Sequence, residues 1–212
     1  MIRIEDKKKC CGCTACYSVC PVDAIDMVED NEGFLYPKVN STKCIKCGLC
    51  EKICPYNKKE TNESDLKECF VAFNKNDKER YISSSGGIFI LLAKKIVEQD
   101  GIVFGSAYDD EYLAEHICVD NEKDLEKLIG SKYMQSRIGN SFSQVKKFLQ
   151  MDKKVLFVGS TCQIAGLKSF LKRDYENLIC VDFICLGTPS PKVWKDYFCL
   201  LYTSPSPRDA HE

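Results

Sequence analysis

From about residue 67 onward, the apolar positions of the chain alternate between two spacings. Short runs of apolar and β-branched residues, typical of strands, are separated by stretches whose apolar residues recur every three or four positions, as in amphipathic helices. The predicted strands are CFVAF (69–73), IVFGSAY (102–108), AEHICV (114–119), KVLFVG (154–159) and NLICVDFIC (177–185). The predicted helices lie within SGGIFILLAKKIVEQDG (85–101), SFSQVKKFLQMD (141–152), QIAGLKSFLKR (163–173) and SPKVWKDYF (190–198). This alternation predicts an α/β domain with a largely parallel sheet.

The N-terminal quarter follows a different pattern, which is set by cysteines. CCGCTACYSVCP (10–21) and CIKCGLCEKICP (44–55) share the spacing C-x2-C-x2-C-x3-C-P, and the second copy follows the first by 34 residues at every matching position. Between them, AIDMVEDNEGFLYPKV (24–39) alternates around NEG, which predicts a small β-hairpin. We therefore expect a separate α+β module at residues 1–56, built on an internal duplication.

The chain has 15 cysteines, which could form disulfides, bind metal or stay unliganded. Its N-terminus has no apolar stretch of signal-peptide length, so we expect a reducing compartment in which disulfides are rare. Zinc is the metal alternative, but structural zinc sites usually draw two C-x2-C pairs from separate loops. The observed spacing is typical of two-cluster ferredoxins, in which the fourth cysteine of each run binds the other cluster. The sequence predicts a ferredoxin module with two 4Fe-4S clusters.

The exchange of the fourth cysteines assigns the ligands. One cluster is expected on Cys10, Cys13, Cys16 and Cys54, and the other on Cys44, Cys47, Cys50 and Cys20. Cys11 is the surplus cysteine of the first run. We expect the apolar residues between the ligands to exclude water, and backbone amides to bond the sulfurs.

Composition marks two further boundaries. NKKETNESDL (57–66) is polar and lacks apolar periodicity, which predicts a linker before the α/β domain at 67–198. After residue 198 the helical pattern gives way to CLLYTSPSPRDAHE (199–212). Residues 199–209 resemble the translation of a transposase sequencing adapter, so we expect a non-native tail and an incomplete α/β domain. A native disordered tail is the alternative.

Overall charge excludes some function classes. The formal net charge is -1 and the isoelectric point is about 6.2, so the chain has no electrostatic footprint for nucleic acid. No apolar run approaches the roughly 18 residues needed to cross a bilayer. We expect a cytoplasmic protein with no membrane span and no nucleic-acid partner.

Three loops carry candidate chemistry, because ligands of such sheets bind at the carboxyl ends of the strands. SSSGG (83–87) opens a helix with hydroxyls and glycines, which suits either an anion site or an ordinary N-cap. GSTCQ (159–163) places Thr161 and Cys162 at a helix N-terminus. There, Cys162 is either a thiolate favoured by the helix dipole or, more commonly, a small buried residue. On local chemistry alone, GSKYMQS (130–136) indicates a solvated connection.

The other cysteines and histidines add little chemistry. The chain has only 2 histidines, and His116 lies within a predicted strand, so we expect it to be packed there. Cys69, Cys118 and Cys180 are expected in the core. A chain so poor in general bases suits electron and hydride transfer, in which a cofactor carries the difficult chemistry.

Four motifs behind the dicluster module carry a resemblance to a known family. SSSGGIF, GSKYMQS, VLFVGSTCQIAGLKSFL and VDFICLGTPSPKVW occur in this order. As a set they resemble the coenzyme F420 hydrogenase/dehydrogenase beta-subunit family, over residues 1–198. The resemblance implies a flavoprotein whose iron-sulfur clusters exchange electrons with FAD, and FAD in turn passes hydride to a deazaflavin coenzyme in the founding members.

Carried over to this chain, the resemblance names six residues beside the flavin. They are Ser85, Gly86, Gly87, Lys132, Thr161 and Cys162. The chain also departs from the family, which often has CHGVPSP where residues 185–191 are CLGTPSP. Because the histidine is missing, we expect no proton relay at that position, and we assign no catalytic residue.

The function expected from these features is an iron-sulfur flavoprotein oxidoreductase. It would relay electrons between two 4Fe-4S clusters and FAD, with a redox partner protein or a small redox coenzyme as its partner. The alternative is a non-catalytic electron-transfer module whose α/β domain docks a partner enzyme. A redox or iron sensor would need an effector surface, which the sequence does not indicate.

Overall fold

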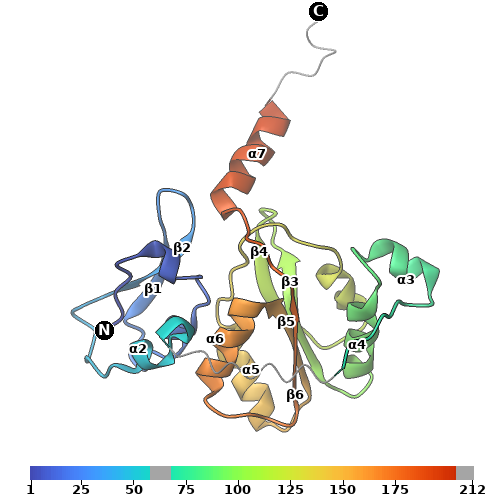
Figure 1. The fold of residues 1–212 in the computed structure, drawn as a ribbon, viewed down its shortest axis with the longest axis horizontal. Coiled ribbons are helices and arrows are strands. Elements are labelled where there is room, and N and C mark those ends of the chain that lie inside the picture. The colour runs from blue at the N-terminus through green and yellow to red at the C-terminus, as the bar shows by residue number, and fades with distance from the viewer. Residues whose placement is uncertain (58–67, 204–212) are drawn as a thin grey trace, which may run out of the picture.

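The computed structural model of the chain describes residues 1–57 and 68–203. Its N-terminal module is a β-hairpin with short helical turns (Figure 1). The elements are η1 (Lys7–Lys9), α1 (Ala15–Ser18), β1 (Ile25–Glu29), β2 (Leu35–Val39), α2 (Leu49–Ile53) and η2 (Pro55–Asn57). β1 and β2 pair antiparallel, with Met27 opposite Pro37. At the turn, one carboxylate oxygen of Asp30 accepts hydrogen bonds from the backbone amides of Glu32 and Phe34. The predicted hairpin is confirmed.

The second part of the chain is an α/β domain with a four-stranded sheet of order β4-β3-β5-β6. Its elements are α3 (Asp77–Ile82), α4 (Ile88–Val97), β3 (Ile102–Tyr108), β4 (Ala114–Val119), η3 (Lys123–Leu128), α5 (Ser141–Gln150), β5 (Val155–Ser160), α6 (Thr161–Leu171), β6 (Leu178–Phe183) and α7 (Pro191–Thr203). β3, β5 and β6 run parallel, and β4 is an antiparallel edge strand. The prediction of a largely parallel sheet is confirmed.

Helices cover both faces of this sheet (Figure 1). Successive residues of a strand point to opposite faces, which divides the core in two. Phe104 and Phe157 belong to the cluster that contains α5 and α6, whereas Val103 and Leu156 belong to the cluster that contains α4 and η3. A strand buried on both faces shows a continuous apolar run, and VLFV in β5 has this form.

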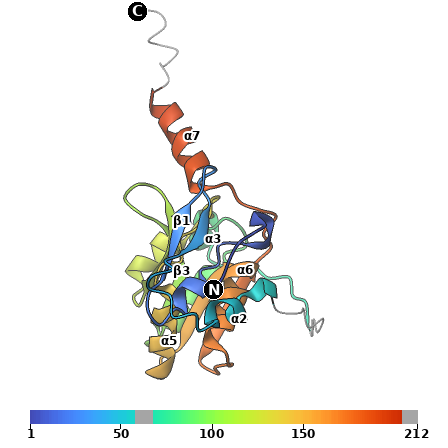
Figure 2. The ribbon, with the colours of Figure 1, turned by 90° about the vertical axis from the view of Figure 1, so that its left-hand side faces the viewer.

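Helix α7 extends past the predicted boundary at residue 199 and projects from the body of the molecule (Figure 2). Its first turns are held by aromatic contacts, with Trp194 stacked on Tyr108 at 6.3 Å between ring centroids. Phe198 lies 5.1 Å from the ring of Tyr112 and 4.6 Å from that of Tyr202, one turn further along the helix. This i, i+4 ring pair favours a helix beyond residue 199. The proposed non-native origin of 199–212 stays a prediction, and 204–212 lie outside the described residues.

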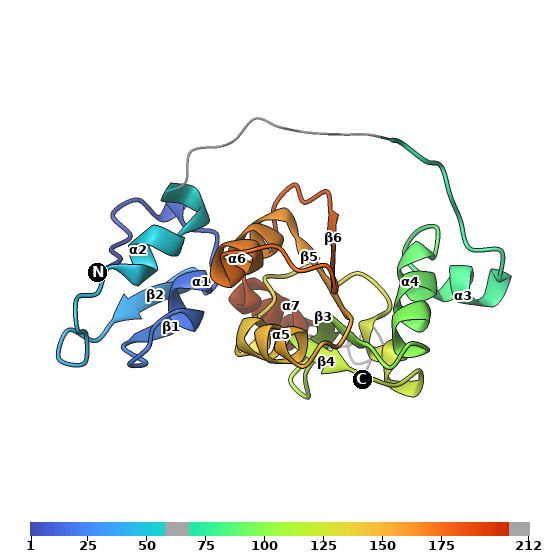
Figure 3. The same cartoon turned by 90° about the horizontal axis from the view of Figure 1, so that it is seen from below.

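The N-terminal module joins the α/β domain on the side of α6, opposite α4 (Figure 3). Cys13, Ala15 and Ile53 belong to the same buried cluster as Phe157 and Leu167 of the α/β core. The two parts therefore share one hydrophobic core. None of the residues in this shared cluster belongs to the predicted linker. Most of that linker, 57–66, lies outside the described residues.

Two predictions about apolar residues are wrong. CFVAF (69–73) forms no strand, and the side chains of Phe70 and Val71 are 81% and 104% exposed. Cys69 and Cys118 are exposed rather than in the core, and Cys180 is half-buried. Cys118 lies on the same face of β4 as the buried Ala114 and His116, so the period of the strand does not account for its exposure.

Within residues 1–57 and 68–203, no helix is both long enough and apolar enough to span a lipid bilayer.

His116 is a packed residue of β4, as predicted, with 8% of its surface exposed. Its Nε2 lies 3.1 Å from the carbonyl oxygen of Val158, which can only accept, so Nε2 donates. Nδ1 then accepts from the hydroxyl of Ser136 at 2.7 Å. Burial lowers the pKa of His116 to about 4, opposed by the hydrogen bond to Val158.

This burial predicts a pH dependence of stability. The pKa of an unfolded histidine is about 6.5, so between pH 6.5 and 4 the unfolded chain binds the proton more readily. The free energy of unfolding should therefore fall as the pH drops through this window, by roughly 3 kcal/mol at most. Urea unfolding at pH 7, 6 and 5 measures the slope. His116→Phe should remove this part of it, and an equal slope in that variant would contradict the assignment.

Candidate functional site

The first cysteine run folds so that thiols from both runs come together. Burial, together with the neighbouring thiols of Cys10, Cys54 and Cys50, raises the pKa of Cys16 to about 12. Burial also raises the pKa of Cys10, with a contribution from Cys54. Cys54 and Cys50 both belong to the second run, so thiols of the two runs meet around Cys16, and the exchange of the fourth cysteines stays a prediction.

The second group of predicted ligands receives hydrogen bonds from the backbone. The amide of Ile2 donates to the sulfur of Cys50 at 3.3 Å, and the amide of Ala24 donates to the sulfur of Cys20 at 3.3 Å. Such bonds stabilise negative charge on a sulfur and tune the potential of a cluster. Cys47 is exposed, whereas Cys44 is half-buried.

Four of the predicted ligands and their neighbours form a small buried group of their own. Cys16 and Cys50 pack with Ile2 and Ile25, and the partly buried Cys20 and Cys54 contact the same group. Within residues 1–57 and 68–203, no group of three or more His, Cys, Asp or Glu side chains is arranged to hold a metal ion as the side chains stand. The ligand assignment therefore rests on the spacing of the runs and on the approach of Cys54 to the first run. The thiols and the dry, amide-bonded surroundings suit a thiolate-ligated cluster.

Cys13 and Cys11 connect the first run to helix α6. Cys13 is buried against Gly166, at which an added Cβ would lie 2.9 Å from the Cβ of Cys13 and 3.1 Å from its sulfur. The neighbouring thiol of Cys13 and burial raise the pKa of Cys11 to about 12, and the thiol of Cys162 opposes this rise.

Cys162 does not have the environment of a low-pKa thiolate. Its hydrogen bond to Cys11 and its burial both raise its pKa, and the hydroxyl of Ser160, 3.2 Å from the sulfur, only partly offsets them. The helix-dipole alternative raised by the sequence is therefore not supported. Cys162 is half-buried at the first turn of α6.

The predicted cofactor loops gather at the carboxyl edge of the sheet. Ser160 ends β5 and starts α6 in a capping box, because its amide donates to Gln163 Oε1 at 2.9 Å. The hydroxyl of Thr161 donates to Asp182, near the end of β6, at 3.2 Å. The amide of Ser131 donates to the hydroxyl of Ser84 at 2.7 Å, which joins the loops 130–136 and 83–87.

Lys132 lies beside the end of β3. Its ammonium group donates to the carbonyl oxygens of Ile129 at 2.8 Å and Lys127 at 3.1 Å, and it lies 5.9 Å from the ring of Tyr108. Burial lowers the pKa of Lys132 to about 8. The loop is therefore more enclosed at Lys132 than the expected solvated connection.

The two glycines of SSSGG lie close to the backbone and side chains of residues 72–74. An added Cβ at Gly86 would lie 3.0 Å from the carbonyl oxygen of Ala72, and one at Gly87 would lie 3.0 Å from the Cβ of Asn74. Gly87 has a φ of +72° and begins α4 without a hydrogen bond from any side-chain cap. Ser85 is exposed. The first amides of α4 therefore lack a side-chain partner, which is the condition for binding an anion.

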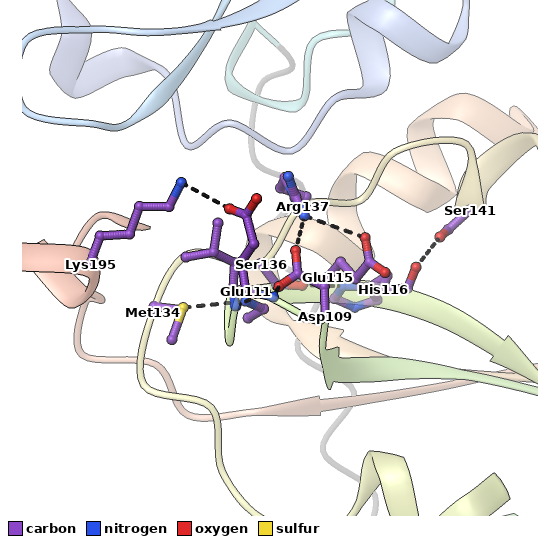
Figure 4. Close-up of polar contacts among 11 residues, drawn as sticks. Asp109, Glu111, Glu115, His116, Met134, Ser136, Arg137, Ser141 and Lys195 are labelled. Atoms are coloured by element: carbon purple, nitrogen blue, oxygen red, sulfur yellow. Dashed lines mark hydrogen bonds and ion pairs between the residues drawn. The ribbon is translucent and has the colours of Figure 1, made fainter. Parts of the chain in front are cut away.

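The loop 130–137 is anchored along its length (Figure 4). Ser136 hydrogen-bonds His116, and Arg137 forms ion pairs with Asp109 and, at 3.6 Å, with Glu115. Met134 accepts a hydrogen bond from the amide of Ala114. These contacts fix the backbone on both sides of residue 135.

Gln135 is a functional candidate that the sequence analysis missed. Its Oε1 accepts from the amide of Leu35 at 3.2 Å, and its Nε2 occupies the space beside Gly12, 2.5 Å from where a Cβ would lie. Gly12 has a φ of +64°, so a glycine is favoured there on two grounds. The side chain of Gln135 thus braces the first cysteine loop from the α/β domain. The sequence analysis did single out the loop GSKYMQS, which contains Gln135. Nothing in the sequence pointed to the partner of Gln135, Leu35, which lies 100 residues closer to the N-terminus.

The hairpin tip makes a third contact between the two parts. Ser190 and Lys192, at the start of α7, donate to the carbonyl oxygens of Glu32 and Asn31. Gly33, with a φ of +84°, leaves room for Lys192. Cys185, in the segment where the family histidine is missing, is exposed.

Comparisons with known proteins match both parts of the chain. The family model described as a 4Fe-4S dicluster domain matches residues 9–58. The model that describes the C terminus of the beta subunit of coenzyme F420 hydrogenase/dehydrogenase matches residues 152–208. No curated protein matches the chain.

Among solved structures, the chain is similar to a chain of the F420-reducing [NiFe] hydrogenase complex from Methanosarcina barkeri. The two are 19% identical, with a TM-score of 0.49, and the similarity covers 65% of this chain and 51% of that one. This chain therefore spans about half the length of the matched hydrogenase chain.

The contact between Gly166 and Cys13 predicts the effect of a single methyl group. Gly166→Ala must push Cys13 away, because 2.9 Å between two Cβ atoms is too short. We expect the variant to lose about 1–3 kcal/mol of unfolding free energy, the usual cost of overpacking. Its iron content after reconstitution should fall as well.

Lys168→Ala is the matched control, because Lys168 is exposed on the same helix. Urea midpoints and iron assays on both variants provide the measurement. A Gly166→Ala protein with the midpoint and iron content of the control would refute the close contact.

Proposed function

The chain belongs to the coenzyme F420 hydrogenase/dehydrogenase beta-subunit family, and on this premise we propose that it is an iron-sulfur flavoprotein oxidoreductase. Its iron-sulfur part transfers single electrons, and FAD would combine them into pairs. Hydride transfer to or from a deazaflavin-type or other small redox coenzyme would complete the reaction. We propose a cytoplasmic location, where free thiols persist.

Two 4Fe-4S clusters are proposed, one on each exchanged set of four cysteines. The observation that carries the proposal is the approach of Cys54 to Cys10 and Cys16. Cys50 of the second run also packs with Cys16, so the spacing of the two runs decides which of the two cysteines belongs to the first set. The amides that bond Cys20 and Cys50 support the second set in the same way.

FAD is proposed at the carboxyl edge of the sheet. The candidate residues are Ser85, Gly86, Gly87, Lys132, Thr161 and Cys162. The uncapped start of α4 and the ammonium group of Lys132 would bind phosphate oxygens. The hydrogen bond between Ser131 and Ser84 supports a common site for two of the three loops.

The third loop supports electron transfer between the two proposed sites. Cys162 follows β5 at this edge, in the first turn of α6, and Gly166 of the same helix lies against Cys13 of the first cysteine run. The region proposed for FAD and the region proposed for a cluster therefore touch through protein atoms. A short path of this kind is what single-electron exchange with a flavin requires.

Replacing Cys54 tests the ligand exchange. Anaerobically reconstituted protein should hold about eight irons per chain, and Cys54→Ser about half as many. After alkylation, mass spectrometry should find Cys10, Cys13 and Cys16 modified in the variant, because their cluster is lost. Cys44 and Cys47 should stay protected. The reverse protection pattern would contradict the exchange, and Cys11→Ser, which removes no proposed ligand, should keep its full iron content.

Replacing Lys132 tests the flavin site. Lys132→Met keeps the length of the side chain but removes its charge, and we expect FAD affinity to fall about tenfold, equal to about 1.4 kcal/mol. Lys127→Met is the matched control, because the ammonium group of Lys127 pairs with Asp124 on the surface. Each reconstituted variant is titrated with FAD, and the change in flavin fluorescence gives its FAD affinity.

Equal affinities in the two variants would count against the site. If the reconstituted protein without substitutions releases no flavin on denaturation, the alternative of a non-catalytic electron-transfer module that docks a partner enzyme is favoured instead.

A further inference from the structure

A cleft of about 520 Å³ lies between the N-terminal module and the helices α5 and α6. The two walls belong to the parts of the chain that meet beside α1 (Figure 3). Val19, Cys20, Pro21 and Leu49 line it from the module, and the other wall comes from α5 and the end of α6. Cys20 is a proposed ligand of the second cluster. The cleft therefore reaches the part of the chain to which electron transfer is assigned.

The wall from α5 is a polar helix face. Ser143, Lys146, Lys147 and Gln150 recur at intervals of three and four residues, which places them on one side of the helix. The buried residues of α5 lie on its other side and belong to the core that α5 shares with α6. The register of the helix thus brings two adjacent lysines to the cleft.

The cleft is positively charged. Among the described residues, three lysines and no carboxylate line it. They are Lys146, Lys147 and Lys172, the C-cap residue of α6, and all three are exposed. The ammonium group of Lys146 lies 5.6 Å from the ring centroid of Phe170 in the cleft wall. Within residues 1–57 and 68–203, none of the three lysines forms an ion pair.

Apolar side chains lie between these charges. Val19 and Leu49 are half-buried on one wall, and Phe170 is buried on the other. An apolar centre with a polar rim is the usual anatomy of a protein interface. Electron-transfer partners form small and weak interfaces, and charges on the rim speed their encounter. The lining of the cleft therefore suits a transient partner that carries negative charge.

We propose that this cleft is the docking surface for an acidic protein that carries single electrons. Carboxylates of the carrier would pair with Lys146, Lys147 and Lys172, which brings its redox group to the side of Cys20. In each encounter one electron passes between the two proteins, so one is oxidised and the other reduced by one electron, and no covalent bond changes. The proposal rests on the proposed function for the role of Cys20 as a cluster ligand.

The test uses anaerobically reconstituted protein and a plant-type ferredoxin as the acidic carrier. Calorimetric titration measures the affinity at low and at high ionic strength. We expect binding at low ionic strength that weakens as salt is added, because the ion pairs lie at an exposed rim. A carbodiimide, which joins amines to carboxylates without a spacer, then fixes the complex. Mass spectrometry should find the ferredoxin linked to Lys146, Lys147 or Lys172.

Charge reversal makes the assignment specific. Lys146→Glu combined with Lys147→Glu should weaken binding about tenfold at low ionic strength and much less at high ionic strength. Lys95→Glu combined with Lys123→Glu is the matched control, because it changes the charge equally at exposed residues of α4 and η3. These two elements pack on the other face of the sheet. The control should bind ferredoxin as the unsubstituted protein does, and both variants should keep their full iron content.

Three results would overturn the proposal. One is no binding of ferredoxin at low ionic strength by protein with full iron content. Another is equal weakening in the two variants, or cross-links spread over lysines of both faces, because the attraction would then be nonspecific. The third is displacement of ferredoxin by inorganic phosphate more strongly than by chloride at equal ionic strength, which would make the cleft a small-anion site. Failure of the proposed function appears separately, as low iron content or missing flavin before ferredoxin is added.

Discussion

The close contact between α6 and the first cysteine loop is the constraint on which the rest of the structure depends. Gly166 lets the helix approach Cys13 to a distance that no larger residue permits. A glycine inside a helix costs about 1 kcal/mol relative to alanine, so its use there needs a gain in packing. That gain is a single buried cluster shared by the α/β core and the cysteine module. The two parts are thereby held together without relying on their linker.

The same burial sets the chemistry of the cysteines. Desolvation raises the pKa of Cys16 to about 12, so without metal its thiol stays protonated near neutral pH. Metal ligands must be thiolates, and binding therefore releases protons and couples to folding. Backbone amides at Cys20 and Cys50 stabilise the sulfur charge that results. Burial disfavours the thiolate form of these cysteines when no metal is bound. A bound cluster would offset that cost, so the buried group is suited to a cluster.

The loop 130–137 contacts both the cysteine module and the edge of the sheet at which FAD is proposed. It is anchored to the sheet through His116, and the ion pair of Arg137 with Asp109 holds it next to the end of β3. From this fixed backbone, Gln135 reaches the cysteine module and Lys132 lies at the carboxyl edge of the sheet. Parallel strands bring their ends to one edge, so a single loop that crosses this edge can contact both proposed sites.

Local patterns in the sequence determined the hairpin, the alternation of strands and helices, and the spacing of cysteines, because each of these depends on residues near one another in the chain. Tertiary structure decided the rest. Apolar composition alone did not make CFVAF a strand, because a strand needs a ladder partner. The contacts of Gln135 with Leu35 and of Gly166 with Cys13 join distant segments, and no periodicity records them. Only the packing of the cysteine module on the α/β domain brings those residues together.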